Sequence, residues 1–104
     1  MTMPLTVHIT ARPDATRVSA VGEIDFDSQG ELERTLIDLC SDQRPVELDL
    51  GDVSFIDSSG LAMLLSIRNL CAESGGMLIV CAPSETVRRV LELAGLSAAF
   101  TIIE

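Results

Sequence analysis

The residues around position 57 mark a change from an extended pattern to a helical one, and no other feature constrains the fold as strongly. Before them, Val46, Leu48 and Leu50 alternate with polar residues, the two-residue period of a half-buried strand. After them, small or apolar residues recur at the spacing of a helix that buries one face, at Gly60, Leu64, Ile67 and Cys71. The sequence therefore predicts a strand that leads directly into a helix from residue 58 to about residue 74.

The chain before this junction predicts a hairpin followed by a helix. Apolar residues alternate with polar ones at about residues 5–10, and a turn sequence with Pro13 separates this segment from a second strand at about residues 16–21. We expect the two strands to pair in antiparallel fashion. A helix follows and ends near Cys40, with Asp27 or Ser28 as its N-cap.

The chain after the junction predicts a strand, a helix and a last strand. The unbroken apolar run at residues 77–81 is typical of a central strand covered on both faces. A helix then starts at Pro83-Ser84, and residues 100–103 form the final strand. The buried side of that helix is predicted to consist of Val87, Val90, Leu91 and Ala94.

The order β-β-α-β-α-β-α-β predicts an α/β fold, a mixed sheet with its helices packed against it. With 104 residues, the chain is long enough for one domain, which we place at residues 1–104.

The charge of the chain restricts its partners. The formal net charge is −9, and an acidic surface repels phosphate backbones and anionic lipids, so we expect neither nucleic-acid nor membrane binding. A basic protein partner fits better. All seven cationic residues are arginines, and the absence of lysine excludes a phosphate-binding P-loop lysine and the lysine of a phospho-aspartate receiver.

The cysteines and the histidine suggest no metal site. Cys40, Cys71 and Cys81 lie far apart within apolar patterns, so we expect three reduced, buried thiols. The single histidine, His8, falls on the polar face of the first strand. The N-terminus lacks an apolar leader segment, and these features together predict a cytoplasmic location.

Three roles are open to Ser58 at the junction: a structural helix cap, a nucleophile or a modified hydroxyl. A nucleophile elbow requires G-x-S-x-G, but Ile56 occupies the first glycine position, and no second histidine supplies a base. We therefore expect no catalytic residue. A magnesium site built from the nearby acids is chemically conceivable but has no further support. The cap and the modified hydroxyl both remain compatible with the pattern.

A stripe of small and polar residues continues from the junction along the predicted helix. Its spacing places these residues on the face opposite the apolar one. Such a stripe is most often a solvated face, although short side chains also permit close approach of a partner. The candidate docking residues are Ser59, Ala62, Ser66 and Asn69.

Three motifs stand out along the chain: Gly22-Glu23-Ile24-Asp25, Asp49-Leu50 and Phe55-Ile56-Asp57-Ser58-Ser59-Gly60-Leu61. They resemble the motifs of STAS domains, and in particular of the stand-alone anti-sigma factor antagonists (anti-anti-sigma factors) of bacteria. The resemblance covers nearly the whole chain and also includes residues 75–76, 80–82 and 90–96.

The resemblance implies a phosphorylation switch without enzymatic activity. The first serine of the motif pair, Ser58, corresponds to the phosphorylated residue, and Asp25 and Asp57 to acids that flank it. It implies that the unphosphorylated form binds an anti-sigma factor and so frees a sigma factor for transcription. That partner is also the serine kinase, of the histidine-kinase-like ATPase type, and a serine phosphatase reverses the reaction. No cofactor is implied for the chain itself, because ATP is used by the kinase.

The same resemblance fits a second system. STAS modules also occur in stressosome-type scaffolds and in lipid-transport complexes, and residue patterns do not separate these uses. An enzyme is the third reading, and the missing base, lysine and metal cluster count against it.

Overall fold

A five-stranded sheet forms the centre of the computed structural model, which describes residues 4–104. The strands follow one another across the sheet in sequence order. The first pair is antiparallel and the other three pairs are parallel, as expected for a mixed sheet. The strands are β1 (Thr6–Ala11), β2 (Thr16–Ile24), β3 (Pro45–Ile56), β4 (Met77–Cys81) and β5 (Thr101–Ile103).

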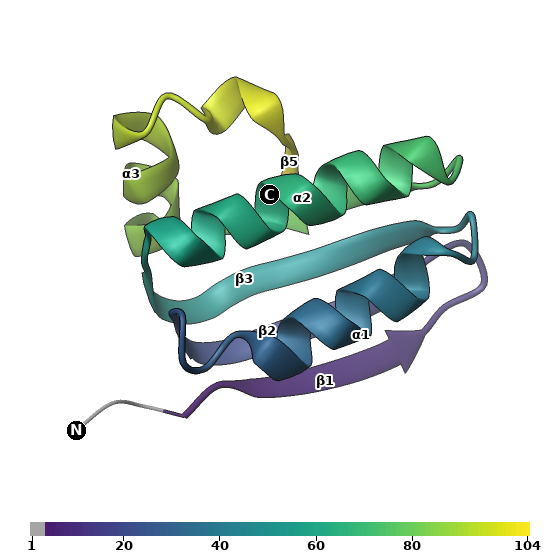
Figure 1. Ribbon diagram of the computed structural model, residues 1–104, viewed down its shortest axis with the longest axis horizontal. Coiled ribbons are helices and arrows are strands. Elements are labelled where there is room, and N and C mark those ends of the chain that lie inside the picture. Colours follow the sequence, from purple (N-terminus) through teal and green to yellow (C-terminus); the bar gives the residue numbers. More distant parts are fainter. Residues whose placement is uncertain (1–3) are drawn as a thin grey trace.

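Two long helices lie side by side across one face of this sheet, as Figure 1 shows. They are α1 (Gly30–Cys40) and α2 (Ser58–Glu73). A third helix, α3 (Glu85–Leu93), packs against the carboxyl half of β3, and a 3-10 turn (Ser97–Ala99) joins it to β5. The observed element order confirms the predicted one. The longest helix has 16 residues, and within residues 4–104 none is both long and apolar enough to cross a membrane.

Aliphatic side chains fill the space between the sheet and α1 and α2. Alternate residues of β2 are buried along its whole length, which is the two-residue period of a strand with one covered face. Fully burying one leucine or isoleucine contributes about 1.5–3 kcal/mol, so these side chains dominate the stability of the domain. The most deeply buried include Val18, Ile24, Leu32, Leu36, Leu48, Leu64 and Ile67.

The second strand is longer than predicted. It continues through Gly22 to Ile24, with irregular pairing to β3 on either side of Gly22. Gly22 has φ +120°, and a Cβ atom there would lie 2.3 Å from the carbonyl oxygen of Pro4. Only glycine fits this position. Because the strand continues, Ile24 pairs with Ile56 at the point where β3 ends.

Three local predictions are wrong. Neither Asp27 nor Ser28 caps α1: the preceding residue is Gln29, which makes no side-chain cap, and the Ser28 hydroxyl donates to the Glu23 carbonyl at 2.7 Å. Ala94 is exposed, because α3 ends one residue before it. The run at residues 77–81 is not buried on both faces, since Ile79 is only half-buried and α1 and α2 cover one face.

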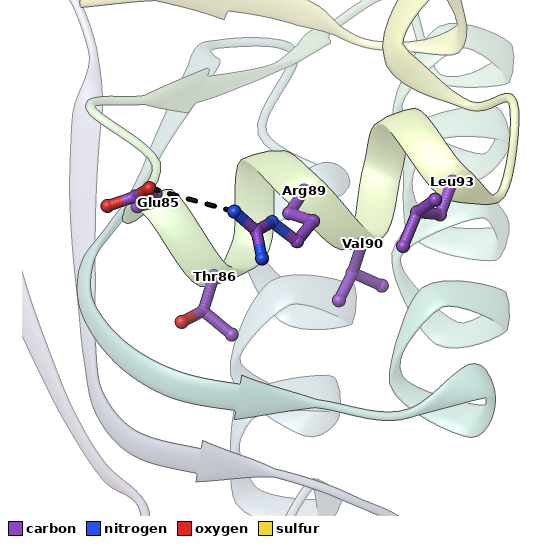
Figure 2. Close-up of a pocket in the computed structure, with 5 residues that line it drawn as sticks. All are labelled: Glu85, Thr86, Arg89, Val90 and Leu93. Carbon is purple, nitrogen blue, oxygen red and sulfur yellow. Dashed lines mark ion pairs between the residues drawn. The ribbon is translucent and has the colours of Figure 1, made fainter.

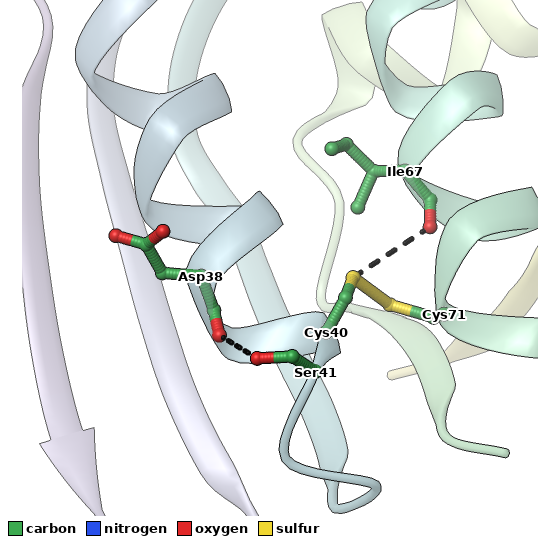
Figure 3. Close-up of a disulfide and its surroundings, with 5 residues drawn as sticks. All are labelled: Asp38, Cys40, Ser41, Ile67 and Cys71. Atoms are coloured by element: carbon green, nitrogen blue, oxygen red, sulfur yellow. Dashed lines mark hydrogen bonds between the residues drawn. A yellow bond between two sulfur atoms is a disulfide. The ribbon is translucent and has the colours of Figure 1, made fainter. Parts of the chain in front are cut away.

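The prediction of three reduced thiols is wrong for two of them. Cys40, the last residue of α1, forms a disulfide with Cys71 near the end of α2 (Figure 3). The two helices bring together residues that are 31 positions apart. Cys81 is free and buried, as expected, and burial raises the pKa of its thiol.

Candidate functional site

The junction between β3 and α2 meets the loop between β2 and α1 at one end of the sheet. Parallel pairing places the carboxyl ends of β2 and β3 next to each other, and the Asp57 N–H donates to the Ile24 carbonyl at 3.1 Å. The loop that begins at Asp25 and the helix that begins at Ser58 therefore start from adjacent points. Residues 25–29 and 57–60 form what we call the junction site.

Asp57, and not Ser58, is the N-cap of α2. One carboxylate oxygen, Oδ1, accepts a hydrogen bond from the Gly60 N–H at 2.9 Å and another from the Ser59 hydroxyl at 2.6 Å. The cap satisfies a backbone donor that the first helical turn leaves unpaired. The possibility that Ser58 serves as the structural cap is thereby excluded.

Hydrogen bonds to the carboxylate lower the pKa of Asp57 below its ordinary value of 3.8. The Ser59 hydroxyl is the largest cause, and partial burial opposes it. The backbone N–H groups of Gly60, Phe26 and Ser59 lower the pKa further. The contribution of Phe26 shows that the β2–α1 loop reaches the cap of α2. Asp57 is therefore ionised at neutral pH and joins the two halves of the junction site.

We expect Asp57→Ala to destabilise the domain by about 1 kcal/mol at neutral pH, the usual cost of losing an N-cap. A carboxyl group whose pKa is lowered in the folded state stabilises the fold above its unfolded pKa. This stabilisation is lost as the pH falls through the folded pKa. The difference between wild type and Asp57→Ala should therefore shrink as the pH falls below 3.8. Urea denaturation at a series of pH values tests this, and a difference that grows with acidity would contradict it.

Ser58 is the first residue of α2, and its side chain is exposed. Within residues 4–104 its hydroxyl has no hydrogen-bond partner, in contrast to the Ser59 hydroxyl. A group added to Ser58 would lie at the amino end of a 16-residue helix, where unpaired N–H groups and the helix dipole favour negative charge. Of the two adjacent serines, Ser58 is therefore the one available for modification.

Asp25 organises the loop on the other side of the site. Its Oδ1 accepts hydrogen bonds from the N–H groups of Asp27, at 3.1 Å, and Ser28, at 2.8 Å. Its own N–H donates to the Ser28 hydroxyl oxygen at 3.0 Å. Asp25 is half-buried, so its first role is to shape the loop. The family resemblance implies that Asp25 and Asp57 flank Ser58, and that role stays a prediction; in the structure Asp25 lies in the β2–α1 loop and Asp57 at the start of α2.

The predicted stripe on α2 lies on the outer surface of the helix. Ala62, Ser66 and Asn69 are exposed, and Asn69 Oδ1 accepts a hydrogen bond from Arg68 at 3.1 Å. Ser59 is half-buried and its hydroxyl is turned toward Asp57. The stripe therefore runs from the junction site along α2, but its first member contributes to the structure of the site.

Phe26 is a candidate that sequence reasoning missed. Its side chain is 76% exposed although its N–H lies at the Asp57 carboxylate. Phe55, two residues before the cap, is also exposed. An aromatic residue between Asp25 and Asp27 was the only available signal. The sequence alone does not show that the ring points away from the core.

A groove with a volume of about 320 Å³ lies on the outside of α3. Figure 2 shows that all of its lining side chains come from that single helix. It contains one exposed ion pair, between Glu85 and Arg89 at 4.0 Å, beside the exposed Leu93. Within residues 4–104, no three acidic, cysteine or histidine side chains form a metal-binding group. We therefore assign neither a ligand nor a metal to this part of the structure.

Comparison with known proteins gives a consistent picture. The chain is 29% identical over 94 residues to the anti-sigma-B factor antagonist of Bacillus subtilis (strain 168), covering 90% of this chain and 86% of that protein. The crystal structure of an anti-sigma factor antagonist from Mycobacterium paratuberculosis superposes with a TM-score of 0.85 and 26% identity, covering 99% and 90% of the two chains.

The same fold occurs in SpoIIAA, a cell fate determinant of Bacillus solved in its phosphorylated form. The TM-score is 0.69 and the identity 19%, with coverage of 94% of this chain and 89% of that one. The family model described as the STAS domain matches residues 6–104. Since this match spans nearly the whole chain and every predicted strand and helix is present, the protein belongs to the STAS domain family.

Proposed function

We propose that this protein is an anti-sigma factor antagonist that is switched by phosphorylation of Ser58. In the unphosphorylated state it binds an anti-sigma factor in the cytoplasm, and a sigma factor is released. The anti-sigma factor is also the serine kinase and uses ATP, a serine phosphatase restores the hydroxyl, and the antagonist itself is not an enzyme. The observation that carries the proposal is the exposed Ser58 hydroxyl beside Asp57, whose carboxylate is already occupied by the helix cap.

The named relatives support the same function. The Bacillus subtilis and Mycobacterium paratuberculosis proteins both carry the name of anti-sigma factor antagonists, and each is similar over at least 90% of this chain. SpoIIAA, which has the same fold, has been solved in a phosphorylated form. A phosphate is thus compatible with this architecture.

Electrostatics at the binding surface would operate the switch. Phosphorylation adds about −1.5 to −2 charges at pH 7. The amino end of α2 tolerates this charge, so the domain stays folded. A partner surface matched to a neutral hydroxyl and the nearby carboxylates of Asp25 and Asp57 would instead meet repulsion and a larger group. The change is therefore in partner affinity and not in folding.

The docking surface would combine the junction site with its surroundings. Asp25, Asp27 and Asp57 provide negative charge, which suits a basic partner. The exposed ring of Phe26 provides apolar area at the same place. Aromatic side chains are enriched among the residues that dominate interface energies. The stripe of Ala62, Ser66 and Asn69 extends this surface along α2.

We expect Ser58→Glu to weaken partner binding at least 100-fold while the melting temperature changes by less than about 3 °C, because the charge is exposed at a helix start. Wild type and Ser58→Glu would serve as paired baits in a lysate of the source organism, with mass spectrometry of the retained proteins. The partner identified in this way is then titrated against both forms. We expect wild type alone to retain an ATP-binding anti-sigma protein.

Thr10→Glu is the matched control. Thr10 is exposed on β1, where it pairs with Arg17, whereas the junction site lies beyond the other end of the pairing between β1 and β2. This variant adds the same charge and should bind like wild type. If Ser58→Glu retains the same partner as wild type, the proposal that phosphorylation of Ser58 controls binding is wrong. If both baits retain a transporter or scaffold subunit, this STAS domain serves another system.

The stripe on α2 is tested by a larger substitution. Ser66→Arg should weaken binding of the same partner at least tenfold, because it places a long side chain on a surface of short ones and adds positive charge opposite a basic partner. Ser41→Arg, at the far end of α1 and also exposed, is its control. Isothermal titration calorimetry measures the affinity of each variant for the partner. Equal affinity for Ser66→Arg and wild type would remove this stripe from the interface.

A further inference from the structure

The disulfide between Cys40 and Cys71 joins the two helices that start at the junction site. Both helices start at that site and run side by side over the sheet (Figure 1), and the bridge connects them near their other ends. The Cα atoms of the two cysteines are 4.7 Å apart, within the normal range for a disulfide. Whether the two cysteines are oxidised or reduced therefore determines whether α1 is covalently linked to α2.

Helix α1 is anchored by few side chains. Its buried residues are Leu32, Leu36 and Cys40, one on each successive turn. It also lacks the side-chain N-cap that Asp57 provides for α2 and Ser84 for α3. Half-buried Leu39 also packs against the core, and among the described residues the bridge is the one covalent link of α1.

The other end of α1 contacts the junction site directly. Gln29, the residue that precedes α1, has its side-chain Oε1 3.4 Å from the Ser59 hydroxyl oxygen. The single proton of that hydroxyl is donated to the Asp57 cap at 2.6 Å, so the contact with Gln29 is a close approach of two oxygens. Ser59 adjoins Ser58 in the sequence. Gln29 therefore places the start of α1 against the residue next to Ser58.

The surroundings of the sulfur pair suit a reduced state as well. Both cysteines are almost fully buried, with 2% and 1% exposure, and a disulfide needs no hydrogen-bond donor or acceptor there. The Ile67 carbonyl oxygen lies 3.8 Å from Cys40 Sγ (Figure 3), where it would accept a hydrogen bond from a thiol. Exposed residues 41–43 follow Cys40 immediately, so opening the last turn of α1 exposes the bridge to solvent.

We propose that Cys40 and Cys71 form a reversible redox site that controls how firmly α1, and with it the junction site, is held. In reduction by a dithiol, a thiolate of the dithiol attacks one sulfur and the S–S bond breaks. Both cysteines finish as thiols, and the dithiol closes into a cyclic disulfide, so two electrons and two protons are transferred. In cytosolic proteins, disulfides are usually of this transient, redox-sensing kind.

The consequence for signalling rests on the proposed function. The oxidised form would present Ser58 on a firmly held surface, and the reduced form would dock its partner less well because the surface must first be ordered. The redox site itself is tested on the isolated protein, so its failure is distinguishable from a failure of the Ser58 switch.

The experiment compares amide hydrogen exchange in the oxidised protein and in protein reduced with dithiothreitol. We expect the amides of α1 to exchange at least tenfold faster after reduction, and the Gly60 amide, which is bonded to the cap, at least threefold faster. Amides of α3 that exchange through local opening of that helix, which packs on β3, should change by less than twofold, whereas amides that exchange only on global unfolding report the loss of overall stability. After removal of the dithiothreitol, oxidised glutathione should restore the original rates, with loss of two free thiols.

Two variants assign the effect to the bridge. Cys71→Ala should show the exchange rates of the reduced protein with or without dithiothreitol, whereas Cys81→Ala, which keeps the bridge, should respond like wild type. Equal acceleration in α1 and α3 would mean that the bridge supports the whole fold uniformly and would overturn the proposal. So would unchanged exchange at α1 or at Gly60, or a reduced protein that does not re-form the bridge.

Discussion

Gly60→Val should destabilise the domain by about 3 kcal/mol, near the upper end of the range for overpacked cores. A Cβ atom at position 60 would lie 2.9 Å from Ile24 Cγ2 and 2.9 Å from Ile56 Cγ1. Both atoms belong to β-branched side chains that are stiff at χ1, so they have little freedom to move away. Movement of the backbone would instead break the 2.9 Å hydrogen bond from the Gly60 N–H to Asp57.

The measurement is urea denaturation followed by far-UV circular dichroism, and the expected loss corresponds to a fall in melting temperature of about 12–20 °C. Ala62→Val, two residues further along the same helix but exposed, is the matched control and should change stability by less than about 0.7 kcal/mol. Gly60→Ala should fall between them, because one methyl group meets the same atoms while helix propensity improves by about 1 kcal/mol. If Gly60→Val matched Ala62→Val, close packing would not be the reason for glycine here.

The spacing of residues in the sequence predicts the position and the buried face of α2, but not its N-cap. The start of the helix after residue 57 and its buried stripe followed from the spacing of Gly60, Leu64 and Ile67, and the structure confirms both. The identity of the cap did not follow. Aspartate and serine are both good caps, and only the backbone path from β3 decides which of the two precedes the first turn.

The same limit applies to the β2–α1 loop. Ser28 follows the predicted second strand and precedes a helical pattern, which favours a cap. In the structure, β2 continues to Ile24, and Ser28 instead accepts from the Asp25 N–H and donates to the Glu23 carbonyl. The alternation of buried residues continues through Gly22 to Ile24, but glycine is depleted in strands, so Gly22 predicts a strand end where the structure has irregular pairing instead.

The disulfide between Cys40 and Cys71 likewise depends on long-range geometry. Cys40 and Cys71 were each correctly assigned to the buried side of a helix from local spacing. Whether two such residues meet depends on the relative positions of α1 and α2 across the sheet, which no local pattern encodes. The exposed ring of Phe26 is a further case, because no local pattern shows that an aromatic side chain in this loop stays outside the core.

Reduction of the bridge should lower the free energy of unfolding by about 3.5 kcal/mol, the loop-closure value for two cysteines 31 positions apart. The reason lies mainly in the unfolded chain, which regains the conformations that the cross-link had excluded. For a domain of this size the melting temperature should fall by about 14–25 °C. Urea denaturation with and without dithiothreitol measures the difference in the wild-type protein.

Variants should be compared by the difference in the free energy of unfolding between the oxidised and the reduced protein, and not by the absolute free energy of either state. Cys81→Ala removes a buried thiol and loses some stability in both states, but the difference should stay near 3.5 kcal/mol because the bridge is intact. In Cys71→Ala the difference should vanish. A wild-type difference below about 1 kcal/mol would mean that residues 40–71 stay compact after unfolding, since a cross-link removes little entropy from a chain that is already constrained.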